Sequence, residues 1–258
     1  MPTSVPSPLN TALPLHWRCG SRSQTALHLF LGTAALLAGL LITMLAVSAS
    51  AQETVFNVPN ADVLDRGKFY AEFDFSYRPS DGGATYTPRF VAGAGHRIEV
   101  GINVGGLATP GNQHTTPTPN IKWKAYDGGD NGWAFVVGDN VFLPAQNRRY
   151  NAGNYAYLEF AKAWKTKTRV TAGAYYFTRD VVSTGQRAGG QFAIEQPINS
   201  RLTLAADWYT GDQVLGYLTP GAAVKLTPAV TWYILYQIGN HGVTDGNHQL
   251  LTEVGWNF

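Results

Sequence analysis

The segment "NHGVTDGNH" near the C-terminus holds the residues that most resemble a chemical site. His241 and His248 flank Asp245, a combination that could bind a metal ion or, with a serine, activate a nucleophile. The serines that follow residue 51 are all distant in sequence; they are Ser76, Ser80, Ser183 and Ser200. Clusters of Gly, Asn and Asp are typical of turns. We therefore predict a loop here, and assign no catalytic residue, no metal ligand and no cofactor.

Ionised side chains recur at every second position of several apolar stretches and form the second candidate set. They would suit a polar passage for small solutes. They would also suit an internal network of ion pairs that fills the space, since buried charges must be paired. Their mixed signs argue against strong anion or cation selectivity. The set comprises Glu72, Asp74, Glu99, Lys122, Lys124, Glu159, Arg169, Glu195, Arg201, Asp207 and Glu253.

These charges lie in segments whose residues alternate between apolar and polar types. In "FYAEFDFSY" (69–77), Phe69 and Phe73 share one face, whereas Glu72 and Asp74 share the other. Successive side chains of a strand point to opposite faces, so the alternation predicts a β-strand. No helical stripe fits the same residues.

Twelve segments of this kind follow one another, and their connections alternate in length. Short links such as 127–132 and 165–168 interleave with longer polar ones such as 78–84 and 107–119. If the short links lie at one end of the strands and the long ones at the other, the chain has an all-β fold. We predict a closed antiparallel up-and-down transmembrane barrel with one rim of short turns and one rim of long loops. The strands are expected at 69–77, 85–94, 97–104, 120–126, 132–142, 154–164, 169–177, 189–196, 201–209, 215–226, 230–238 and 248–258.

Three features predict that the apolar faces point outward, into lipid. The clearest strands have about 9–11 residues, the length that crosses a bilayer when tilted. Aromatic residues such as Tyr77, Trp164 and Trp208 stand near the ends of the apolar faces, as in interface girdles. The opposite faces mix charges with Gly and Ala, which suits a wet lumen. Lys162 is an exception on the apolar face, near a short turn from which its stem could reach the interface.

The chain ends in "LLTEVGWNF", in which Leu250, Val254, Trp256 and Phe258 lie on one face. A terminal aromatic on an alternating last strand resembles the C-terminal signal of Gram-negative outer-membrane β-barrel proteins. The resemblance covers 67–258 in pattern and 250–258 as a motif. It implies a bacterial outer-membrane location, contact with outer-membrane lipids and lipopolysaccharide, and binding of the last strand by the barrel-assembly machinery through edge pairing.

The first part of the chain resembles an export signal. An apolar stretch at 26–47 follows two arginines and precedes an A-x-A pattern that ends at Ala51. The leader is longer than is usual for such signals, and a retained membrane anchor is the alternative. The predicted organisation is a cleaved signal peptide (1–51), a periplasmic N-terminal segment (52–66) and a transmembrane β-barrel (67–258).

The exported part of the chain has no net charge. Removing the two leader arginines, Arg18 and Arg22, from the 19 basic residues leaves 17, equal to the 17 acidic residues. Nucleic-acid binding needs a basic surplus, so this balance argues against it. Arg148 and Arg149, in a predicted external loop, could hold lipopolysaccharide phosphates or an anionic solute, or could simply be solvated.

The function that the sequence favours is a porin-like channel or transport barrel for small solutes, not an enzyme. A side-chain-filled barrel remains open, because twelve strands lie between the filled eight and the open sixteen. The alternative is a non-conducting structural or adhesive barrel whose loops carry the function. A surface lipid hydrolase is less favoured, because the His-x-Ser-Asn-Gly arrangement of the twelve-stranded outer-membrane phospholipases is absent.

Overall fold

The computed structural model describes residues 54–109, 115–145 and 151–258. The predicted signal peptide and the Arg148–Arg149 pair lie outside these ranges. Within them, no helix is long and apolar enough to cross a membrane.

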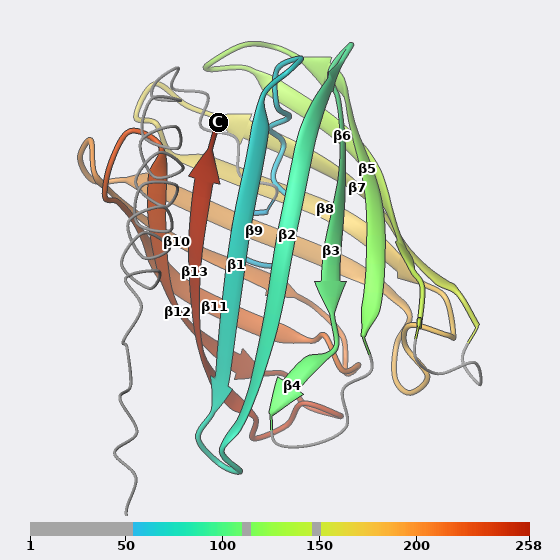
Figure 1. The fold of residues 1–258 in the computed structure, drawn as a ribbon. Helices are drawn as coiled ribbons and strands as arrows, with labels where there is room; N and C mark the ends of the chain where they lie inside the picture. Colours follow the sequence, from blue (N-terminus) through green and yellow to red (C-terminus); the bar gives the residue numbers. More distant parts are fainter. Residues whose placement is uncertain (1–53, 110–114, 146–150) are drawn as a thin grey trace, which may run out of the picture. The chain divides into compact units, whose positions relative to one another are not determined.

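Thirteen strands form one antiparallel sheet (Figure 1). They are β1 (Phe69–Arg78), β2 (Gly83–Gly95), β3 (Ile98–Gly105), β4 (Leu107–Thr109), β5 (Thr116–Asp127), β6 (Trp133–Phe142), β7 (Gly153–Ala163), β8 (Arg169–Phe177), β9 (Ala188–Pro197), β10 (Leu202–Tyr209), β11 (Tyr217–Lys225), β12 (Val230–Gly239) and β13 (His248–Asn257).

The sheet closes on itself because β1 pairs with both β2 and β13. At the seam, the N–H of Phe258 donates to the carbonyl of Phe69 at 2.9 Å, and the N–H of Phe69 donates back at 3.3 Å. The short β4 pairs only with β2 and follows β3 after Gly106, whose φ of 76° turns the chain. The other twelve strands make the ring, so the predicted closed antiparallel barrel is confirmed.

The two rims differ as the sequence predicts, with one correction. His96 and Arg97 link β2 to β3 with φ values of 53° and 61°, the backbone of a tight two-residue hairpin. The expected long connection at 78–84 is shorter than predicted, because β1 and β2 extend until only residues 79–82 join them. There Arg78 and Asp81 form an ion pair at 2.8 Å.

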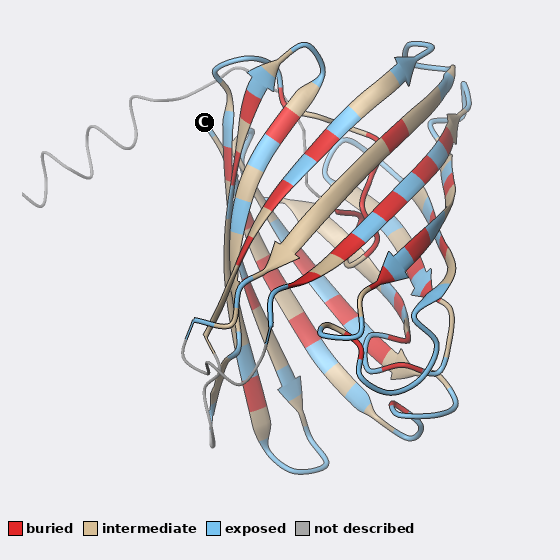
Figure 2. Ribbon diagram, turned by 90° about the vertical axis from the view of Figure 1, so that its right-hand side faces the viewer, coloured by how far each residue is buried: buried red, intermediate tan, exposed pale blue. Residues whose placement is uncertain are grey.

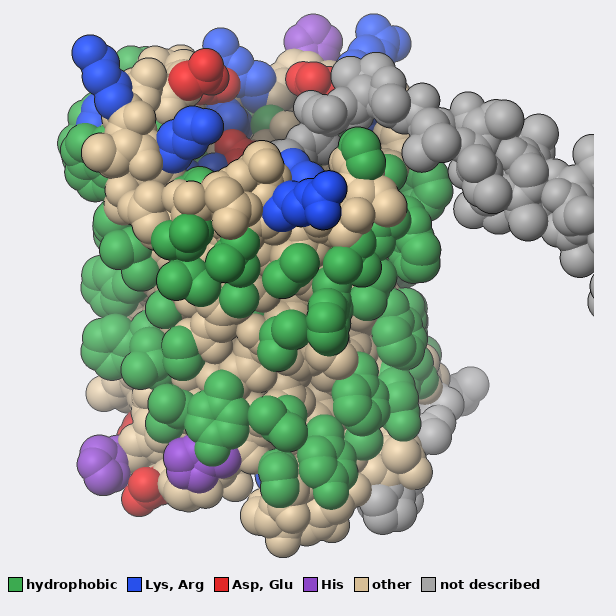
Figure 3. Space-filling view, turned by 90° about the vertical axis from the view of Figure 1, so that its left-hand side faces the viewer, with side chains coloured by type: hydrophobic (Ala, Val, Ile, Leu, Met, Phe, Trp, Pro, Cys, Tyr) green, Lys and Arg blue, Asp and Glu red, His purple; other side chains and the backbone are tan. Residues whose placement is uncertain are grey.

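Burial alternates along the strands, as the alternating colours in Figure 2 show. In β7 the side chains of Tyr155, Tyr157 and Glu159 are buried, whereas Leu158 and Phe160 are exposed. On the face shown in Figure 3, exposed hydrophobic side chains cover the wall and Lys and Arg gather at one rim. Exposed hydrophobic residues occur on strands all around the ring, and together they are called the belt below. The predicted orientation, apolar face outward, is therefore correct.

Lys162 is placed at the edge of this belt. Its Nζ donates to the carbonyl of Asn131 at 2.9 Å, in the turn before β6, and lies 5.5 Å from the centre of the Trp133 ring. The stem thus crosses apolar surface while the charge reaches a polar turn, as expected from the sequence.

If the belt lies in lipid, the cost of placing a charge on it should depend on the depth of the residue in the membrane. Phe73, in the middle of β1 and 47% exposed, should resist replacement by a charge: Phe73→Arg is expected to lower the free energy of unfolding by about 2–4 kcal/mol. Phe69→Arg, at the end of the same strand and 42% exposed, should cost only about 0–1 kcal/mol. Urea unfolding of the folded barrel in lipid vesicles measures both; equal losses would contradict a lipid-facing belt.

Candidate functional site in the barrel lumen

Residues 54–66 are called the lumenal plug below; residues 54–64 lie inside the barrel, and Asp65 and Arg66 are exposed. Figure 1 shows this part of the chain as a blue coil within the ring of strands. It contacts Asp207 on β10, Arg169 on β8 and Glu99 on β3. The sequence placed 52–66 ahead of the barrel, in the periplasm; the described part of that segment instead occupies the lumen.

Asp207 holds the plug through its backbone. One carboxylate oxygen, Oδ2, accepts hydrogen bonds from the backbone N–H groups of Phe56 at 3.1 Å, Asn57 at 2.5 Å and Val58 at 2.8 Å. Successive N–H groups that converge in this way form an anion-binding nest. The side chain of Asp207 is 1% exposed, so the nest supplies the compensation that a buried carboxylate requires.

Asn57 ties the same turn to three neighbouring strands. Its amide donates to the Thr219 hydroxyl on β11 at 2.9 Å, and its carbonyl oxygen Oδ1 accepts from Gln237 on β12 at 3.0 Å. Its backbone carbonyl accepts from the Tyr209 hydroxyl on β10 at 3.3 Å. Every polar group of this side chain is therefore satisfied by the wall.

Apolar residues of the plug pack between these polar contacts. Val55, Phe56 and Val58 are buried and belong to one cluster with Tyr155, Tyr209 and other wall residues. Aromatic rings of the wall also contact one another, as in the stacked Tyr155–Phe177 pair. The plug and the wall thus share an apolar cluster inside the lumen, where the sequence predicts charges mixed with Gly and Ala.

The part of the plug nearer β1 is held by charges. Asp62 forms an ion pair with Arg169, which also makes a bidentate contact with Glu195, and Asp62 lies 3.7 Å from Lys124. Burial alone would raise the pKa of Asp62, but these cations, chiefly Arg169, outweigh it, so its pKa lies below the usual value. The carboxylate is therefore ionised at neutral pH.

A second ion pair fixes the plug to β3 and β5. Lys122 Nζ lies 2.7 Å from Glu99 Oε1, and both side chains are buried. The other oxygen of Glu99 accepts from the backbone N–H of Leu64 at 2.9 Å. The pair therefore compensates its own charges and binds the plug at the same time.

Three buried carboxylates gather at the β1–β13 seam. Oxygens of Glu72, Asp74 and Glu253 all lie within 4.8 Å of one another. Arg89 on β2 approaches Asp74 at 2.7 Å and Glu72 at 3.6 Å. The hydroxyl of Tyr70 donates to Glu72. This acidic cluster depends on the charge of Arg89, since like charges at this separation repel.

Glu159, on β7, is buried, and its only side-chain partner among the described residues is a neutral amide. The Gln191 amide donates to Glu159, and the Gln191 carbonyl oxygen accepts from the Tyr155 hydroxyl at 2.8 Å. The resulting chain of hydrogen bonds crosses from β7 to β9.

The predicted lumen residues are mostly where the alternation places them. Lys124, Arg169 and Glu195 face inward but are partly accessible, whereas Arg201 is exposed in the turn before β10 and does not line the lumen. The fully buried members are Glu72, Asp74, Glu99, Lys122, Glu159, Asp207 and Glu253.

Two charged residues of the lumen, Arg89 and Asp62, were not predicted from the sequence. Arg89 lies on the same face of β2 as Thr85 and Thr87. The alternation of apolar and polar residues is faint in this strand, but its two-residue period would have been enough to predict that Arg89 points inward. Asp62 lies in a stretch without periodicity, so no pattern pointed to its contact with Arg169.

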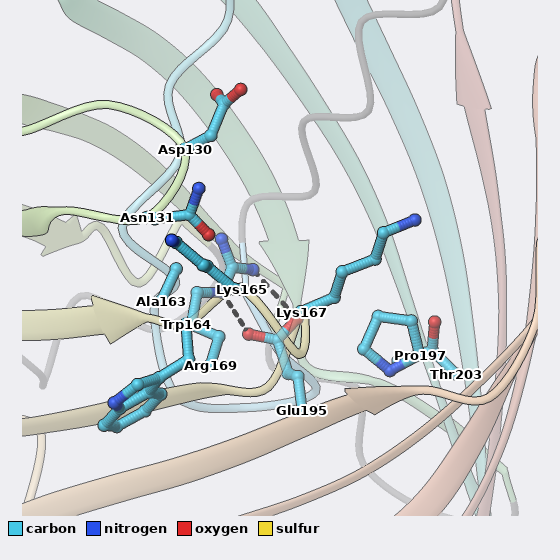
Figure 4. A pocket seen from close by; sticks show the side chains of 10 residues that line it. All are labelled: Asp130, Asn131, Ala163, Trp164, Lys165, Lys167, Arg169, Glu195, Pro197 and Thr203. Atoms are coloured by element: carbon cyan, nitrogen blue, oxygen red, sulfur yellow. Dashed lines mark hydrogen bonds and ion pairs between the residues drawn. The ribbon is translucent and has the colours of Figure 1, made fainter.

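Two cavities open toward opposite rims. One of about 480 Å³ faces the long connections, with Arg78 and Phe142 near its opening and Thr54, Asn57 and Pro59 of the plug at its floor. The other, of about 610 Å³, lies at the short-turn rim, where Figure 4 shows Lys165 and Lys167 beside the Arg169–Glu195 pair. The plug contacts residues that line both cavities and therefore separates them.

The histidine segment singled out in the sequence is a surface turn. His241 is fully exposed, and its Nδ1 lies 3.4 Å from Asp245 Oδ2. Among the hydrogen bonds of residues 54–109, 115–145 and 151–258, none joins a histidine to a serine. Ser76, for example, donates to Gln249.

Leu250, Trp256 and Phe258 of the last strand are exposed on the outer face, and Val254 lies on the same face, half-buried. Glu253 points into the lumen. This is the arrangement that the alternation of "LLTEVGWNF" predicts.

The fold is a closed antiparallel β-barrel of twelve strands with an apolar outer face and a lumen that holds charges. No protein-family model matches the chain, and no curated protein matches it in sequence. Among solved structures, the KdgM porin in complex with disordered oligogalacturonate aligns over 73% of this chain and 99% of its own, with a TM-score of 0.55 and 9% identity. The NanC porin aligns over 73% and 98%, with a TM-score of 0.54 and 12% identity. The chain therefore has the fold of an outer-membrane porin.

The acidic cluster makes the next prediction. Arg89→Met removes the charge that faces Asp74 and Glu72, and should lower the free energy of unfolding by about 3–5 kcal/mol, because buried carboxylates are left without it. The measurement is heat or urea unfolding of the detergent-solubilised barrel.

Arg78→Met is the matched control, since its ion pair with Asp81 is exposed and contributes little. A similar small effect of both substitutions would show that the seam does not depend on Arg89.

Proposed function

We propose that this protein is an outer-membrane channel for small polar solutes. The observation that carries the proposal is a lumen lined by paired charges and hydrogen-bonding groups, with cavities of about 480 and 610 Å³ at its two ends. A barrel of this size encloses more space than wall side chains alone fill. The apolar belt and the porin fold support a location in the bacterial outer membrane.

The lining of the cavity at the long-connection rim favours an uncharged, hydroxyl-rich solute. Hydroxyl and amide groups, including Thr87, Asn103 and Gln249, line it beside the ring of Tyr217. The two arginines that line it, Arg78 and Arg89, are each paired with a carboxylate. The KdgM structure holds an oligogalacturonate, and a saccharide also suits the groups that line this cavity.

A non-conducting barrel is the second candidate, and the plug is the observation that favours it. Residues 54–64 fill the middle of the lumen and are bonded to wall strands on several sides. In that case the loops would carry a structural or adhesive function. The exposed His241–Asp245 pair supports no proposal of lipid hydrolysis.

Conductance in planar lipid bilayers separates these candidates. We expect the refolded protein to give discrete single-channel steps with weak ion selectivity, because the lumen carries both signs of charge. A folded barrel, identified by its heat-dependent gel migration, that never produces a step would support the structural candidate instead. Addition of a neutral oligosaccharide should reduce the current if the cavity binds such a solute.

The last strand supports a further part of the proposal, recognition by the barrel-assembly machinery. Phe258 is exposed at the seam, and its backbone pairs with Phe69 of β1. Before closure the same edge of β13 is unpaired and can add to a strand of another protein. We also propose that the belt contacts outer-membrane lipids, with lipopolysaccharide at the rim of long connections.

Deletion of Phe258 tests the assembly role. The deletion should reduce the amount of barrel in the outer membrane of cells several-fold, while the heat stability of barrels refolded in detergent changes little, because only one pair of seam hydrogen bonds is lost.

Phe69→Ala, which truncates the apolar partner across the seam, is the control and should insert normally. Normal insertion of the deletion variant would remove the assembly role from Phe258.

A further inference from the structure

We infer that the lumenal plug, residues 54–66, is a releasable gate whose displacement from the Asp207 nest opens the lumen. The inference rests on the proposed channel function and names how that channel is closed.

The plug crosses the lumen from one wall to the other. It meets the wall at Glu99 on β3, Lys122 on β5, Arg169 on β8, Asp207 on β10, Thr219 on β11 and Gln237 on β12. In the ring of twelve strands, β3 and β10 are separated by five strands in each direction. Contacts on opposite sides of the ring mean that a solute has to displace the plug to pass.

The plug is attached without joining the sheet. Its one β-bridge, between Thr54 and Pro59, is internal to the plug. Between Thr54 and Leu64 the plug is hydrogen-bonded to side chains of the wall, as in its contacts with Asp207 and Glu99. A strand of the ring cannot leave without breaking a ladder of backbone bonds, whereas this segment can. The attachment therefore permits release while the barrel stays closed.

The end of the plug nearest β1 is fixed and provides the pivot. The N–H of Gly67 donates to the carbonyl of Gly93 at 3.0 Å, and the N–H of Gly93 donates to the carbonyl of Lys68 at 2.9 Å. Gly67 has a φ of 77° and open space around it. Residues before Gly67 can therefore swing while the chain remains tethered at β2.

Asp207 is the latch because its contact is reversible. In the closed state one of its oxygens serves three backbone N–H groups. When the plug leaves, the lumen admits water, which can solvate both the carboxylate and the freed N–H groups. Opening is opposed by the free-energy cost of exposing Val55, Phe56 and Val58 to water, since these side chains are buried in the closed state. This balance favours closure and allows brief opening.

A disulfide lock tests the gate directly. The side chains of Asn57 and Thr219 meet at 2.9 Å, so the double variant Asn57→Cys/Thr219→Cys can join the plug to β11. The experiment uses the full chain with Cys19→Ser, which removes the single native cysteine. The control is Ser76→Cys/Leu251→Cys, a pair that lies directly opposite in the register and joins the wall strands β1 and β13.

We expect oxidation of the plug lock to reduce the open probability in planar bilayers at least tenfold, and a thiol reductant to restore it. Oxidation of the wall control should change neither. Asp207→Asn, which weakens the nest while keeping the shape, should raise the open probability several-fold, and deletion of residues 54–64 should raise it further.

The outcomes distinguish the gate from the channel. A cross-linked plug lock that conducts like its reduced form overturns the gate and leaves the channel proposal intact. Silence of every folded variant, including Asp207→Asn, overturns the channel and the gate together. If the deletion variant does not fold, the lock and Asp207→Asn still decide between these results.

Discussion

The structure depends on one constraint, that a backbone in lipid must satisfy its own hydrogen bonds. Closure between β1 and β13, with the Phe69–Phe258 exchange at its end, removes the open edge of the sheet. Once the sheet is closed, each strand has one face in lipid and one in the lumen. The two-residue period of the chain then decides which side chains meet which environment, and the ionised residues are turned inward.

Charges that are turned inward must be compensated, and here different partners do so. Glu99 is paired with Lys122, and Glu195 with Arg169, both from neighbouring strands. Asp207 instead takes its partners from the backbone of the plug. The wall and the plug therefore complete each other electrostatically: without the plug, Asp207 would need water in its place.

The wall could be predicted from the sequence because a strand's period is local. β8 agrees with its predicted range at both ends, whereas β5 begins four residues before its predicted start because Pro117 and Pro119 interrupt the strand signal. The plug could not be predicted. Its ligands for Asp207 are backbone N–H groups, which every residue except proline carries, so no side-chain pattern distinguishes them.

The barrel's width explains why its filling is a segment of chain and not only wall side chains. Eight strands leave an interior that side chains fill, whereas twelve leave more. Side chains fixed to the wall cannot leave the lumen, but a chain tethered at Gly67 can move as one unit. The plug lines the cavity at the long-connection rim and contacts Arg169, which lines the other cavity. In the proposed channel, one element would thus form the floor of the solute cavity and the barrier to passage. Thr54, Asn57 and Pro59 of the plug line the cavity at the long-connection rim, so a solute of the proposed channel would meet this part of the plug there, and Asn57 ties it to three strands.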